Sequence, residues 1–340
     1  MNLMQPWILL RLLAGLTATL LVVRSSMISL RILRHFDARW ATEGQLALER
    51  QAELAATLVR VAAWIQVGAL VLSVLAADRL HHSVRGAMCA YGVLSDNRWG
   101  FPALGLTAGV AFIAGLIVQL CAFDRRVRSL DLVRPIAVIS ILMAPLSIAD
   151  LGFTAGFLAR LDLTVVSSCC SSQLDVGALG GREFPSGPRL VVSAIALVTV
   201  SLSIVVGWAA SLRPRASTAM LAAAVSLIAL PAMLCAAVLE VAPYAFELPQ
   251  HACPFCLLRP EVLGIGYPLF GSIFLAAVWT VGAGVSGLAR TGQASMADAF
   301  DHFARTRLRR GALAWLVSLV FGLGPVLRYA ILSGGRPLFP

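Results

Sequence analysis

The stretch LVVSAIALVTVSLSIVVGWAAS, residues 190–211, contains no charged side chain. About 20 mostly apolar residues are enough for an α-helix to cross the hydrocarbon core of a bilayer. The stretch is too long, and alternates too little between polar and apolar residues, to be a strand of a membrane barrel. It predicts a membrane-spanning helix, because a helix satisfies its own backbone hydrogen bonds in lipid.

Seven further stretches of this kind predict an all-α polytopic membrane protein with about eight transmembrane helices. The chain is 59% hydrophobic and 13% charged, with a mean hydropathy of +0.85, whereas soluble domains are nearer about 45–50% and about 25%. This composition excludes a soluble, disordered or fibrous protein. The predicted spans are residues 7–30, 58–77, 102–123, 135–158, 190–211, 218–243, 265–289 and 311–333.

The connecting segments are short, and one of them has a charge pattern of its own. Residues 35–57 carry acidic and basic side chains among Ala and Leu. We expect this segment to form a surface helix between the first two spans.

All 27 basic residues are arginine, and they lie mainly in short loops between the apolar stretches. The positive-inside rule places the arginine-rich loops in the cytoplasm. It therefore predicts that both termini and the loops 78–101, 159–189 and 244–264 lie outside. The net charge of +10 is then a topology signal, and we expect a lipid bilayer, not nucleic acid, around this protein. The expected location is the inner (cytoplasmic) membrane of a bacterium, with the cysteine-containing loops on the periplasmic side.

The seven cysteines are unevenly distributed. Cys121 and Cys235 lie within predicted spans, where a thiol packs as a small apolar group. The other five lie in the three loops predicted to be outside, on the oxidising face where disulfides persist. These five are Cys89, Cys169, Cys170, Cys253 and Cys256, and the same loops hold His81, His82 and His251.

The motif Cys253-Pro-Phe-Cys256 follows His251 after one residue. Its spacing is typical of dithiols that cycle between oxidised and reduced states, and it also supplies half of a tetrahedral thiolate metal site. A static disulfide that fixes the loop is a third interpretation. In a redox role, one of the two cysteines would attack, and His251 would favour its thiolate if protonated or hydrogen-bonded to it.

Adjacent Cys169 and Cys170 can bond each other only through a strained ring. We expect them to bond different partners, or together to hold a soft ion such as Cu(I), Hg(II) or Zn(II). Cys89 follows His81 and His82 closely enough to share a site with them. Taken alone, the two histidines are better explained as solvated loop side chains.

Two segments of the chain are similar in sequence. Residues 89–100, CAYGVLSDNRWG, align without a gap to residues 253–264, CPFCLLRPEVLG. After a two-residue insertion, FPALG at 101–105 matches YPLFG at 267–271. The alignment predicts two four-helix halves in parallel repeat, with the functional site at their interface. The predicted halves are residues 1–165 and 190–340, joined by the outer loop 166–189.

The two similar segments differ at one chemically important position, where Gly92 aligns with Cys256. The halves are therefore chemically unequal. If one of them carries an active dithiol, it is the second.

Asp150 and Glu240 lie toward the outer ends of the fourth and sixth predicted spans. A carboxylate at this depth is costly and is often a proton relay or a cation ligand. Arg11 and Arg328 lie at a similar predicted depth and could neutralise the two carboxylates. We expect structural ion pairs.

Three functions remain open on this basis. The first is a thiol–disulfide relay that passes electrons to a quinone or to a periplasmic thioredoxin-like thiol protein. Its motif resembles that of membrane enzymes that pass electrons between thiols and quinone, although those use two cysteine pairs. The second is binding or transport of a soft metal such as copper, zinc or mercury. The third is a non-catalytic membrane subunit or scaffold of a larger complex, with disulfide-braced loops.

The arrangement of the sulfurs distinguishes these functions. Convergence of all three loops near a quinone-sized crevice favours the relay, convergence with histidine but without a crevice favours the metal site, and separate, buried disulfides favour the scaffold. The candidate relay residues are Cys89, Cys169, Cys170, Cys253, Cys256 and His251, and the metal alternative adds His81 and His82.

Overall fold

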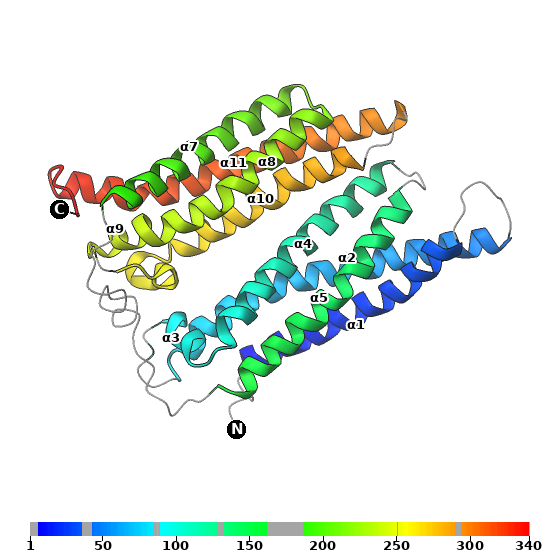
Figure 1. Ribbon diagram of the computed structural model, residues 1–340, viewed down its shortest axis with the longest axis horizontal. Coiled ribbons are helices and arrows are strands. Elements are labelled where there is room, and N and C mark those ends of the chain that lie inside the picture. The colour runs from blue at the N-terminus through cyan, green and yellow to red at the C-terminus, as the bar shows by residue number, and fades with distance from the viewer. Residues whose placement is uncertain are drawn as a thin grey trace. The chain divides into compact units, whose positions relative to one another are not determined.

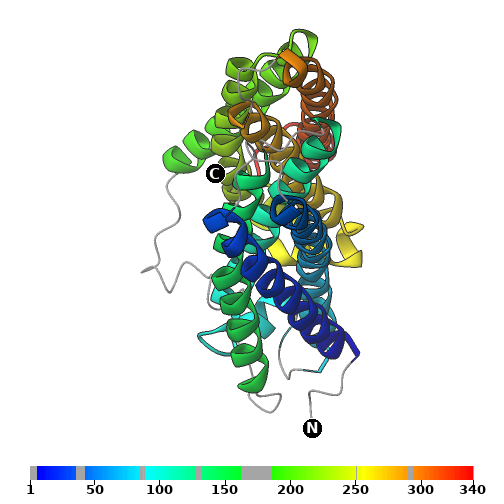
Figure 2. The ribbon, with the colours of Figure 1, turned by 90° about the vertical axis from the view of Figure 1, so that its right-hand side faces the viewer.

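The computed structural model describes residues 6–35, 43–83, 87, 89–127, 132–161, 186–249, 251–289 and 294–339. Over these residues the chain consists of helices joined by short turns, without a strand (Figures 1 and 2). Eight of the described helices are long and apolar enough to cross a membrane. The protein is an all-α polytopic membrane protein, as the sequence predicts.

The chain divides into two compact units. Unit 1 comprises Met1–Arg79, Leu94–Asp162 and Leu288–Phe300, and unit 2 comprises Leu80–Val93, Leu163–Gly287 and Asp301–Pro340. The long helices of unit 1 are α1 (Pro6–His35), α2 (Glu43–Leu80), α4 (Gly100–Val127) and α5 (Val133–Ala159). Those of unit 2 are α7 (Ser186–Leu212), α8 (Ala216–Ala236), α10 (Gly266–Leu288) and most of α11 (Ala294–Leu332).

Shorter elements lie between the long helices. They are α3 (Ala90–Ser95), the π-helical turn η3 (Ala237–Val241), α9 (Ala242–Phe246), and the 3-10 turns η4 (Pro254–Leu258) and η5 (Pro260–Val262). Because α8, η3 and α9 follow one another without a break, together they form the sixth predicted span.

Two helices are longer than predicted. Helix α2 begins at Glu43, so residues 43–57 of the expected surface helix are the first part of α2, and His35 is the last residue of α1. Helix α11 begins at Ala294 rather than near residue 311. Past Gly44, neither polar extension contains Gly or Pro, so nothing interrupts the helix before its apolar part. At about 1.5 Å per residue, both helices exceed the roughly 30 Å of hydrocarbon, and their polar ends extend beyond it.

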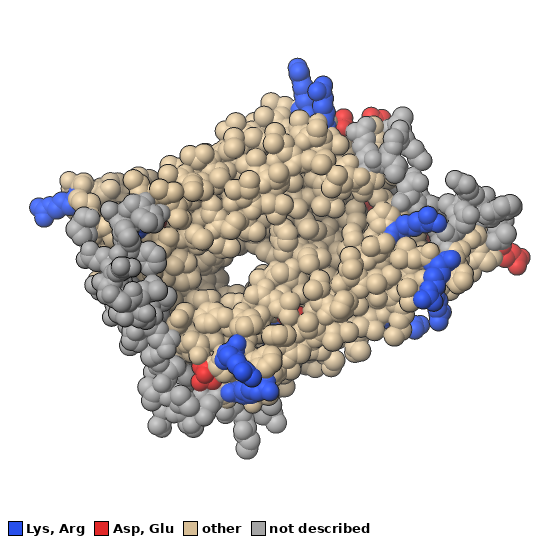
Figure 3. All heavy atoms as spheres, in the orientation of Figure 1, with Lys and Arg blue, Asp and Glu red and all other residues tan. Residues whose placement is uncertain are grey.

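The surface of the long helices is apolar. In Figure 3 the Arg, Asp and Glu side chains gather near helix ends, and the surface between them carries few charges. Large apolar side chains such as Leu142, Val198 and Ile228 are exposed on α5, α7 and α8. Such a surface is stable against lipid tails and would be unfavourable in water.

In unit 1, one buried arginine connects all four long helices. Arg11 of α1 is 2% exposed, and its Nη2 donates to both carboxylate oxygens of Asp150 on α5, at 3.1 and 3.0 Å. The same nitrogen donates to Thr107 of α4 and Thr154 of α5, and Nε donates to Ser73 of α2. This confirms the expected ion pair between Arg11 and Asp150.

In unit 2, the core includes residues from the four long helices and from a connecting turn. Val200 of α7, Met233 of α8, Ile273 of α10 and Trp315 of α11 belong to one buried cluster. Leu257 of η4 is fully buried in the same cluster. The turn that carries Cys256 is therefore anchored to the helices.

Replacing Asp150 with Leu is expected to destabilise the protein by roughly 3–5 kcal/mol, because it leaves a buried guanidinium without its counter-charge. Unfolding of the purified protein in detergent, followed by circular dichroism, measures the loss. The double variant Arg11→Met, Asp150→Leu removes both charges and should recover most of the stability.

The exposed pair of Arg259 and Glu261 supplies the control, because Glu261→Gln should change stability by less than about 1 kcal/mol. If the double variant is as unstable as Asp150→Leu alone, the uncompensated charge is not the cause of the loss.

Candidate functional site

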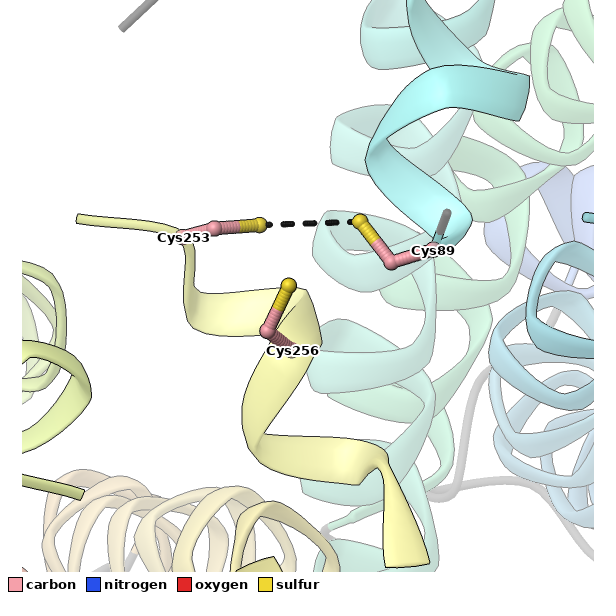
Figure 4. A group of neighbouring side chains, drawn as sticks. All are labelled: Cys89, Cys253 and Cys256. Carbon is pink, nitrogen blue, oxygen red and sulfur yellow. Dashed lines mark hydrogen bonds between the residues drawn. The ribbon is translucent and has the colours of Figure 1, made fainter. Parts of the chain in front are cut away.

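Three cysteine sulfurs from two distant segments meet within unit 2 (Figure 4). The Sγ atoms of Cys89, Cys253 and Cys256 all lie within 4.8 Å of one another, and those of Cys89 and Cys253 are 3.8 Å apart. The three residues are 1%, 1% and 4% exposed. A disulfide has a sulfur–sulfur length of about 2.05 Å, and none joins the cysteines of the described chain.

The local sequence explains how Cys253 and Cys256 come together. Pro254 opens the 3-10 turn η4, a first-turn position that suits proline because it has no N–H to satisfy. The backbone N–H of Cys256 then donates to the carbonyl of Cys253 at 3.3 Å. This tight turn brings the two sulfurs together, and buried Leu257 fixes it to the core of unit 2.

Cys89 approaches from the other segment, directly before helix α3. The backbone N–H of Gly92 donates to its carbonyl at 3.1 Å, closing a similar turn. Three aromatic side chains pack against the sulfur cluster: Tyr91, Phe246 and Phe255. The sulfurs therefore lie in a largely apolar environment.

His251 lies beside this cluster without joining its donor group. Its ring packs on Phe246 with 4.3 Å between centroids, and its buried Nε2 has no hydrogen-bond partner among the described residues. Burial lowers the pKa of His251 below its ordinary value. The charge of Arg259 lowers this pKa further, whereas the electrostatic interaction with Cys89 raises it. Among the described residues, the donor atoms that lie within 4.8 Å of one another are the three sulfurs of Cys89, Cys253 and Cys256. A neutral imidazole provides no positive charge to favour a thiolate.

The other two predicted histidines do not join the three sulfurs. The rings of His81 and His82 are 3.9 Å apart, and neither belongs to the donor group of the cysteines. Cys169 and Cys170 lie outside the described residues. Of the two cysteines within spans, Cys121 is buried in α4 as expected, whereas Cys235 is exposed on α8.

Glu240 occupies the π-helical turn η3. Pro243 follows and lacks an N–H, so it cannot make the usual helical bond, and the N–H of Ala242 donates five residues back, to Ala237. The carboxylate of Glu240 accepts bonds from Arg189 at 2.7 Å and from Ser193 at 2.8 Å. Glu240 is thus paired at the start of helix α7.

The expected ion pair of Glu240 is therefore observed, but Arg328, one of its two expected partners, is not involved. The Nη2 atom of Arg328 lies 3.7 Å from Oε1 of Glu247, and both side chains are exposed. A π-helical turn inserts an extra residue into the helical repeat and changes the direction of the side chains around it. Depth along the span was therefore not enough to identify the partner.

Comparison of the chain with protein-family models, curated proteins and solved structures finds no match in any of the three. The function therefore has to be argued from the site itself. Its distinguishing feature is the group of three buried thiols.

We expect the imidazole of His251 to titrate below its ordinary value of 6.5, because burial disfavours the charged form. Between the lowered pKa and 6.5 the unfolded chain binds more protons than the folded protein. Stability is therefore fully present above this window and falls as the pH drops through it. Histidine ¹³C NMR, assigned through His251→Gln, measures the titration, and a midpoint above 6.5 would contradict the expectation.

Proposed function

We propose that this protein binds a thiophilic metal ion through Cys89, Cys253 and Cys256. The observation that carries the proposal is the convergence of three sulfurs within 4.8 Å. With metal–sulfur bonds of about 2.3 Å, tetrahedral or trigonal geometry places neighbouring sulfurs about 3.8–4.0 Å apart. The 3.8 Å between Cys89 and Cys253 fits this spacing, and thiolates favour soft ions such as Cu(I) and Zn(II).

The burial of the cluster supports metal binding over exchange with an external thiol. Cys253 is 1% exposed, so a protein thiol has little access to its sulfur. Three thiolates in an apolar shell would repel one another and lose hydration. A bound cation compensates for both effects, and each thiol releases its proton as the ion binds.

Proximity of the sulfurs also supports a second candidate, a thiol–disulfide relay. The Cys253 sulfur lies near both Cys89 and Cys256, so small movements allow a disulfide to either one. Attack by a Cys89 thiolate on a Cys253–Cys256 disulfide would form a Cys89–Cys253 bond and release Cys256 as thiolate. This exchange is redox-neutral and reverses when the Cys256 thiolate attacks the Cys253 sulfur. An electron acceptor is needed only after an outside dithiol has reduced the disulfide to two thiols. Re-forming the disulfide then releases two electrons and two protons, which a bilayer quinone would accept.

The proposal places the cysteine site on the periplasmic side of a bacterial inner membrane. The distribution of arginine supports this orientation, because the loops on the other side of the predicted topology are richer in arginine. A site in this location would exchange ions with the periplasm or with a partner protein there.

The reduced protein is expected to bind one ion per chain when titrated anaerobically with Cu(I), Zn(II) or the spectroscopic probe Co(II). Replacing Cys89, Cys253 or Cys256 with Ser removes a ligand and should weaken binding by more than the roughly 10–100-fold effect of losing an outer-shell partner. Chelator competition measures the affinity, and thiolate-to-Co(II) charge-transfer absorption reports sulfur ligation.

Cys235→Ser is the matched control, because Cys235 lies on α8 outside the cluster. Binding that is equally strong in Cys253→Ser and Cys235→Ser would refute the metal site. Absence of binding, together with a Cys253–Cys256 disulfide that opens in mild reductant and exchanges with Cys89, would favour the relay in its place.

A further inference from the structure

The two segments that form the cluster are built alike around their first cysteine. Cys89 directly precedes α3, and Cys253 directly precedes η4. In each segment the cysteine carbonyl accepts a bond from the backbone N–H three residues later, from Gly92 at 3.1 Å and from Cys256 at 3.3 Å. The position occupied by Cys256 in one segment is therefore occupied by Gly92 in the other.

Aromatic packing supports the same equivalence. Tyr91 and Phe255 each lie two residues after the first cysteine of their segment. Both pack against the three cysteines of the cluster. The two segments thus present corresponding residues to one site.

The correspondence continues to the following long helices. Helix α4 begins at Gly100 and α10 begins at Gly266, and each is followed by an aromatic residue and proline. A Cβ on Gly100 would collide with the backbone of Leu94, and one on Gly266 would lie 2.9 Å from Leu257 and Leu258. Gly100 therefore matches Gly266 in structure. The two-residue insertion of the second segment then lies before Gly266 rather than after the matched glycine.

Two equivalent Cys-x-x-Cys turns would offer four thiolates, but glycine at position 92 leaves three. We infer that Gly92 determines the selectivity of the site, favouring Cu(I) over Zn(II). This inference rests on the proposed metal-binding function. It assigns to the site a three-coordinate monovalent ion as ligand.

The coordination chemistry of the two ions supports this selectivity. Structural Zn(II) sites are almost always closed by four protein ligands in tetrahedral geometry. Cu(I) is a softer ion that thiolates bind well with fewer ligands. The apolar side chains of Phe246 and Phe255 around the sulfurs disfavour a water molecule as the fourth ligand of zinc.

The test compares Gly92→Cys with Gly92→Ser in the full-length protein, reduced and in detergent. Gly92→Cys adds a fourth thiol and is expected to raise Zn(II) affinity at least about tenfold relative to Cu(I). Gly92→Ser adds a side chain of similar size without the thiol and should leave the ratio unchanged. Competition with Cu(I) and Zn(II) chelators gives both affinities.

An unchanged affinity ratio in Gly92→Cys, or an equal change in Gly92→Ser, would overturn the inference. A wild-type protein that binds neither ion would refute the proposed metal site itself, so the two failures are distinguishable.

X-ray absorption of the wild type loaded with Cu(I) tests the inference without a change at Gly92. Three sulfurs at about 2.3 Å are expected. Four sulfurs, falling to three in the double variant Cys169→Ser, Cys170→Ser, would overturn it by locating the fourth ligand in that loop.

Discussion

A backbone amide inside the hydrocarbon core has no water to bond to, and this constraint organises the whole chain. It makes the eight apolar stretches helical and restricts irregular backbone to the segments between them. In the described chain, the two non-glycine residues with positive φ, Glu247 and Leu263, lie between α9 and α10. The turn that carries Cys253 and Cys256 lies in the same segment. These two cysteines therefore lie in a segment whose backbone is not part of a long regular helix.

The same constraint acts on polar side chains within the helices. Arg11 is surrounded by hydroxyl and carboxylate groups from three other helices, and Glu240 is paired with Arg189. A route for ions through the spans would need polar steps, and Asp150 and Glu240 were the candidates in the sequence. Both are engaged in ion pairs, which favours binding at the cysteine cluster over transport through the helices.

How much of this could be predicted depended on whether the signal was local. Each span is a continuous apolar run, so hydropathy located all eight. The polar beginning of α2 was predicted as a separate surface helix and that of α11 was missed, because hydropathy does not report helix that continues beyond the apolar run. The partner of Glu240 was missed because Arg189 lay in the predicted outer loop 159–189, directly before the fifth span, whereas the structure includes it in α7.

The candidate site shows the same limit at longer range. Cys89 and Cys253 are 164 residues apart, and the sequence placed them in separate loops on one side of the membrane. Topology and the internal sequence similarity suggested that they were related, but could not show that their sulfurs touch. The sequence alignment of the two similar segments also placed the two-residue insertion after the matched glycine instead of before it. The alignment could not reveal which glycine packs against the preceding leucine.

The geometry that suits metal binding also suits oxidation, and the two uses compete. Three neutral thiols can be buried together at little electrostatic cost, whereas three thiolates require a cation. If Cys253 forms a disulfide with either neighbour, two of the three ligands are withdrawn and the ion is released. A bound ion in turn occupies the sulfur lone pairs that would attack a disulfide. Under the proposed function, metal occupancy and thiol oxidation are therefore mutually exclusive states of one cluster, and the redox state of the compartment would set how much ion the protein holds.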